Sequence, residues 1–100
     1  MSETTQATTP EAEVQRLRAY VDAARQAGNQ DIVLDALARI AVIRRDDPSA
    51  HSELAMALAG AERYEEAIAP FRWALSLDPD NAALHCALGN ALKYTGRFNK

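Results

Sequence analysis

The sequence predicts an all-α fold built from antiparallel helix-turn-helix units. Positions of similar character recur every 34 residues, apolar residues within each unit fall at helical spacing, and Gly, Pro, Asp or Asn interrupts the pattern where a helix would end. The composition agrees, because 48% hydrophobic but only 6% aromatic residues suit close-packed helices better than a sheet.

The 34-residue period is clearest at the turns. Gly28, Glu62 and Gly96 are separated by this interval, and the same shift aligns Leu37 with Phe71. Glycine is favoured where a helix ends in a left-handed backbone conformation. Glu62 occupies the equivalent place without this freedom, so the sequence predicts that the middle turn is the most strained of the three.

Five helices are expected, over Glu11–Ala27, Asp31–Arg44, Ser49–Ala61, Tyr64–Leu77 and Ala82–Tyr94. The first keeps Leu17 in register with the repeat and stops before Gly28. For the second helix, Asp31 is the N-cap candidate. For the third, the candidate is Asp47, which Pro48 follows at a first-turn position that favours proline.

The fourth helix contains Pro70, which removes one backbone hydrogen bond near the N-terminal end, so we expect a bend and no break. The segment Asp78 to Asn81 closes this helix. After the fifth helix, Gly96 supplies a turn and Phe98 is expected to open another helix. The predicted organisation is a disordered tail over residues 1–10 and a domain over residues 11–100, with units at 14–47, 48–81 and, incomplete, 82–100.

The charge and cysteine content limit the partners. A net charge of −3 gives no overall attraction for nucleic acid or an anionic membrane, and no apolar run approaches the ~20 residues that span a bilayer. The single cysteine, Cys86, has no internal disulfide partner, and the first residues lack the pattern of a secretory signal. These observations predict a cytoplasmic protein that binds neither nucleic acid nor membrane.

The repeated residues resemble the tetratricopeptide repeat (TPR), a 34-residue helix-turn-helix unit with the pattern W-x2-L-G-x2-Y, A-x3-F and P. The second unit has His51-x2-Leu54-Ala55-x2-Leu58, Ala67-x3-Phe71 and Pro79, and the third opens with His85-x2-Leu88-Gly89-x2-Leu92. The first unit departs from the pattern, with Val33 for the alanine and Arg45 for the proline.

The resemblance implies a right-handed TPR superhelix whose first helices line a concave groove for a peptide or a helix of a partner protein. Carried over by position, the groove residues are Arg18, Asp22, Arg25, Ser49, Ser52, Met56, Cys86, Asn90 and Lys93, with Gln15 and Ala83 beside them. The family's clamp for carboxylate tails is not expected, because Ser52, Met56, Ala83 and Ala87 hold the corresponding positions.

No catalytic residue, cofactor or metal site is predicted. His51 and His85 occupy the same repeat position, which indicates a structural, at least half-buried role, and a metal site with Cys86 would lack a third ligand. The acidic pairs Asp46-Asp47 and Glu65-Glu66 open helices, where negative charge is favourable. Trp73 is expected on the outer side of the second helix, either packed against the next unit or exposed as a convex-face contact.

Three functions remain open at this stage. The first is a binding module without catalysis that takes a partner segment in the groove. The second is an accessory N-terminal domain of a larger bacterial enzyme, of the glycosyltransferase or sulfotransferase type. The third is self-assembly, because the array is expected to be cut after its fifth helix; this would leave Leu88 and Leu92 without a covering partner and favour a homo-oligomer through the open end.

Overall fold

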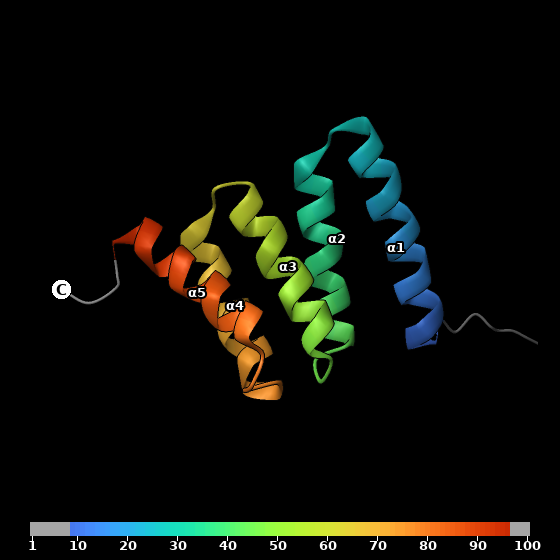
Figure 1. Ribbon diagram of the computed structural model, residues 1–100. Helices are drawn as coiled ribbons and strands as arrows, with labels where there is room; N and C mark the ends of the chain where they lie inside the picture. The colour runs from blue at the N-terminus through green and yellow to red at the C-terminus, as the bar shows by residue number, and fades with distance from the viewer. Residues whose placement is uncertain (1–8, 97–100) are drawn as a thin grey trace, which may run out of the picture.

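A computed structural model describes residues 9–96, which form five α-helices and no strand in that range (Figure 1). Their bounds are Pro10–Ala27 (α1), Gln30–Ile43 (α2), Pro48–Gly60 (α3), Tyr64–Leu77 (α4) and Ala82–Thr95 (α5). The all-α prediction is therefore confirmed. Part of the predicted tail, residues 1–8, lies outside the described residues, as do Phe98 and the helix expected to begin there.

Side-chain caps explain where four of the helices begin. Thr9, Asn29, Asp47 and Asn81 each accept a hydrogen bond from a backbone N–H of the first turn, at 3.1, 3.3, 2.9 and 3.1 Å. Such caps satisfy donors that have no partner inside the helix. The structure confirms Asp47 with Pro48 as a helix start.

Two predicted helix starts were wrong. Asn29, and not Asp31, caps α2, so Asp31 lies in the first turn as an acidic residue that complements the helix dipole. Thr9 and Pro10, assigned to the disordered tail, instead form the cap and the first residue of α1. In both cases a capping residue close to the predicted start satisfies the first-turn amides equally well.

The three turns confirm the prediction about strain. Gly28 and Gly96 adopt positive φ angles of 73° and 75°, and Glu62 has a φ of 64°, the one positive value at a non-glycine residue in the described range. The Asn29 N–H donates to the Ala24 carbonyl, and after Glu62 the matching bond runs from Arg63 to Leu58, at 2.8 Å in both turns. The same Schellman-type ending is therefore built once with a residue that disfavours it.

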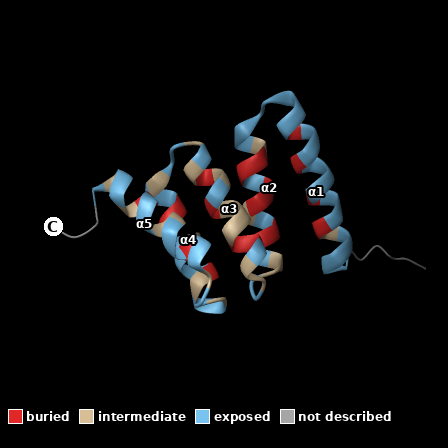
Figure 2. Ribbon diagram, viewed as in Figure 1, coloured by how far each residue is buried: buried red, intermediate tan, exposed pale blue. Residues whose placement is uncertain are grey.

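The core consists of two clusters that follow the repeat (Figure 2). One lies between α1, α2 and the start of α3, and the other joins α3, α4 and α5 with Leu34 of α2. Phe71 and Leu37, which the period aligns, are among the most completely buried side chains. Leu54 and Ala57 pack against both clusters, so α3 connects the two halves of the core.

Contacts join each helix to its neighbours along the chain, and α3 also touches α5. The result is elongated, with principal extents of 61 × 31 × 16 Å. Pro70 lies inside α4, which is assigned as one continuous helix from Tyr64 to Leu77. In residues 9–96, none of the helices combines the length and the apolar character needed to cross a membrane.

The expectation that Leu88 and Leu92 lack a partner was wrong. Both are half-buried and pack against the second core cluster. The rings of Tyr64 and Tyr94 also stack, with centroids 4.6 Å apart, and tie the end of α5 to the start of α4. Contact with α4 therefore covers much of the apolar side of α5.

Candidate functional site

The predicted groove residues lie on the three helices that open each unit. We call their surface the first-helix face; it carries Arg18, Asp22 and Arg25 from α1, Ser49, Ser52 and Met56 from α3, and Cys86, Asn90 and Lys93 from α5. Eight of these side chains are exposed and Ser52 is half-buried. They are therefore accessible to a ligand, although they come from segments far apart in the sequence.

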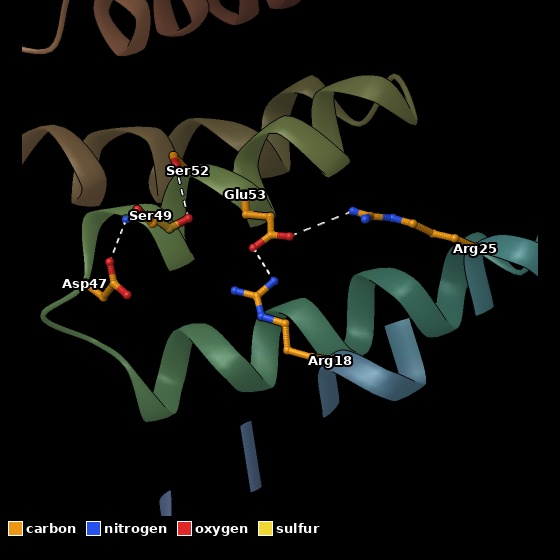
Figure 3. A network of polar contacts seen from close by, with 6 residues as sticks. All are labelled: Arg18, Arg25, Asp47, Ser49, Ser52 and Glu53. Atoms are coloured by element: carbon orange, nitrogen blue, oxygen red, sulfur yellow. Dashed lines mark hydrogen bonds and ion pairs between the residues drawn. The ribbon is translucent and has the colours of Figure 1, made fainter. Parts of the chain in front are cut away.

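An ion-pair bridge spans the α1 side of this face (Figure 3). Arg18 Nη1 lies 2.6 Å from Glu53 Oε1, and Arg25 Nη2 lies 4.0 Å from Glu53 Oε2. The exposed position of these groups limits the stabilisation to about 0–1 kcal/mol. Its main effect is to hold both arginines toward α3 and to leave one net positive charge among the three groups.

Glu53 was not among the predicted site residues. Sequence reasoning placed it at a position where other members of the family carry a ladder asparagine, and did not connect it with α1. A usable signal was present, because first helices of successive units are neighbours in such repeats and Glu53 and Arg18 carry opposite charges at nearly equivalent positions.

The α3 part of the face is partly occupied by its own hydrogen bonds. Ser52 Oγ donates to the Ser49 carbonyl at 3.1 Å, and Asp47 Oδ1 accepts from the Ser49 backbone N–H at 2.9 Å (Figure 3). One turn further along α3, the Met56 side chain is 57% exposed. Met56 is therefore the large apolar side chain that this face offers to a ligand.

The two histidines repeat one contact, as their equivalent positions predicted. His51 Nε2 lies 2.9 Å from the Arg45 carbonyl and His85 Nε2 lies 2.8 Å from the Pro79 carbonyl, six residues back in each case. A carbonyl oxygen only accepts, so Nε2 carries the proton in both rings. His51 is buried, but His85 is exposed, so its expected burial was wrong.

Trp73 packs toward the preceding unit, and not toward the next unit as one of the two readings expected. Its Nε1–H donates to the Arg45 carbonyl at 2.8 Å, and its ring lies 5.5 Å from the His51 ring, centroid to centroid. The side chain is still 48% exposed. It is thus anchored on one side and open to solvent on the other.

Beside Trp73 runs a hollow that we call the α2/α4 groove. Its first section has a volume of about 510 Å³ and is lined by Ala38, Ala41, Val42, Arg45, His51, Leu54, Ala69, Pro70 and Trp73. These residues come from α2 and α4, from the loop after α2, and from α3. Most of the lining is apolar, and Arg45 is the one Arg, Lys, Asp or Glu among these nine residues.

A second section of about 460 Å³ continues the groove, since it shares Ala38, Leu54 and Pro70 with the first. Its charged lining consists of three carboxylates and one guanidinium, from Asp31, Asp35, Glu66 and Arg63. The hydrogen bond from Arg63 lowers the pKa of Glu66. The groove therefore has a negative end and, near Trp73, a positive one.

Sequence reasoning missed this groove apart from Trp73. Its alanines matched the core pattern, although Ala69 is exposed and Ala38 is half-buried. The available signal was Val42, a β-branched apolar residue that lies outside the repeating stripe and is 74% exposed. In the described part of the chain, no three His, Cys, Asp or Glu side chains gather closely enough to hold a metal ion.

Comparison with known proteins identifies the repeat. The profile of the family described as TPR repeat matches residues 61–96. Two solved structures are similar, MamA AMB-1 (TM-score 0.72, 25% identity) and a mutant of MamA (TM-score 0.72, 24% identity). Each alignment covers 89% of this chain but only 46% and 47% of those structures, so the chain spans about half their length.

No curated protein matches the sequence. The profile match covers the second helical hairpin and α5, and the structural similarity extends over most of the chain. Together with the 34-residue period, these findings show that the chain is a tetratricopeptide-repeat protein, with the fold of a protein–protein interaction module.

Proposed function

We propose that this protein binds a peptide or a helix of a partner protein on the first-helix face and performs no catalysis there. The observation that carries the proposal is the exposure of Met56 at the middle helix of that face. A flexible thioether surrounded by small and polar side chains can adapt to an apolar side chain of a ligand. Asn90 and Lys93 add polar contacts from α5.

The charges of the face restrict the ligand. Arg18 and Arg25 are held by Glu53, so a ligand carboxylate would compete with that residue for them. The positions of the family's carboxylate clamp hold Ser52, Met56, Ala83 and Ala87. We therefore propose an internal segment with an apolar anchor, and not an acidic C-terminal tail, as the ligand.

The test uses random peptides displayed on phage and selected on the immobilised protein. Peptides that bind the first-helix face should lose affinity about tenfold or more on Met56→Lys, because the substitution places a hydrated charge where the apolar anchor docks. Met56→Leu is the matched control and should preserve binding. Circular dichroism checks that both variants keep their helix content.

The outcome against the proposal is equally specific. If every selected peptide binds the Met56→Lys variant as tightly as the original protein, the first-helix face is not the binding site.

A further inference from the structure

The α2/α4 groove differs from the first-helix face in position and in chemistry. Leu54 and Glu53 are neighbours on α3, but Leu54 lines the groove, whereas Glu53 pairs with arginines of α1. Adjacent helical residues point about 100° apart. The groove is thus a separate surface, and a ligand on one need not touch the other.

Three features make the first section of the groove suitable for docking. The lining residues Ala38, Ala41 and Ala69 are small, which allows a ligand backbone to approach closely. Val42 and Trp73 are exposed, one on each of the flanking helices. Because Trp73 is already fixed by its hydrogen bond to Arg45, binding would cost little of its side-chain freedom.

The groove also has a direction. From Asp31 to Arg45 it follows α2 for roughly 20 Å, which corresponds to about four helical turns. The Asp31 end carries the excess of carboxylates, and Arg45 supplies the positive charge at the other end. A ligand with the opposite order of charges would be complementary along the whole length.

We propose that the α2/α4 groove is a second docking site, which takes an amphipathic helix of a partner protein. The apolar stripe of that helix lies over Ala38, Ala69 and Trp73. An acidic side chain of the partner faces Arg45, and a basic side chain faces Asp31 and Asp35. This site is independent of the ligand proposed for the first-helix face.

The same phage selection tests this site when Ala69→Glu is used as the discriminating variant. Ala69 is exposed on α4, so the substitution places a carboxylate in the groove without disturbing the core. Ala23→Glu is the matched control, because Ala23 is an exposed alanine on α1 outside the groove. We expect a class of peptides that lose affinity about tenfold on Ala69→Glu and keep it on Ala23→Glu and Met56→Lys.

The sequences of these peptides provide a second readout. They should carry apolar residues at i, i+3, i+4 and i+7 with an acidic residue toward one end and a basic residue toward the other. A synthetic copy with the acidic and basic residues exchanged should bind about fivefold more weakly or worse. Equal affinity of the exchanged copy would overturn the proposed direction and with it the partner chemistry.

Two further results would overturn the proposal. One is a selection in which no peptide distinguishes Ala69→Glu from Ala23→Glu. The other is a concentration-dependent dimer, detected by sedimentation velocity, that Ala69→Glu abolishes and Ala23→Glu does not, since the groove would then hold a second copy of this chain. Failure of the Met56 test alone leaves this result intact, so the two proposals can be separated.

Discussion

The two loops that join successive units contain the same histidine contact but differ in what covers it. His51 donates to the Arg45 carbonyl and His85 to the Pro79 carbonyl at nearly equal distances. At the first loop, Trp73 of the following hairpin donates to the same carbonyl and packs against the imidazole. The repeat therefore copies the local hydrogen bond, while burial depends on the helix that packs next to it.

This difference also shapes the surface. Both lone pairs of the Arg45 carbonyl are used, by His51 and by Trp73, which fixes the indole at the edge of the α2/α4 groove. The His85 ring has no aromatic partner among the described residues and remains exposed. A position in the repeat thus becomes part of a potential docking site only where a neighbouring unit contributes an aromatic side chain.

The largest expected effect separates the two histidines. His51→Ala should lower the free energy of unfolding by about 2 kcal/mol, because it removes a buried hydrogen bond and the contact with Trp73. His85→Ala should cost about 0.5 kcal/mol, since the same bond is exposed to water there. Urea unfolding followed by far-UV circular dichroism measures both, and equal losses would contradict the comparison.

Trp73→Phe sharpens the comparison by keeping an aromatic ring while deleting the indole N–H. We expect a loss of about 1 kcal/mol, the usual net value of one hydrogen bond. In the His51→Ala background, ring packing is already gone, so the double variant reveals whether the two residues act through their shared contact. Strict additivity of the two losses would show that they do not.

The turns offer a smaller effect of opposite sign. Glu62→Gly should stabilise the protein by about 0.5–1 kcal/mol, because glycine adopts the positive φ of this turn without strain. Glu62→Ala is the matched control and should leave stability nearly unchanged, since alanine retains the strain. Thermal unfolding distinguishes the two variants, and an equal gain from both would assign the effect to the lost charge.

Local signals made most of the fold predictable. Helix ends were placed within one or two residues because caps such as Asp47 and turn residues such as Gly28 and Gly96 act on the backbone next to them. The apolar period likewise identified Phe71 and Leu37 as core. The wrong cap at Asp31 shows the limit of this reasoning, because two suitable residues lay two positions apart.

The site was predictable only as far as the repeat register extends. Register placed Met56 and Asn90 on the helices that form one face. It did not reveal that Glu53 bridges to α1 or that Trp73 reaches back to Arg45, because such contacts depend on how one unit is rotated against the next. The α2/α4 groove arises from the same long-range geometry, so sequence spacing alone did not define it.

The most direct test of the account is to map peptide binding on the isotope-labelled protein by amide chemical shifts. Peptides selected without bias should perturb either amides around Met56, Asn90 and Lys93 or amides around Ala38, Ala69 and Trp73. Two separate sets of shifts would support an interaction module with two independent surfaces. Shifts confined to other regions, such as the outer side of α1 around Tyr20, would contradict it.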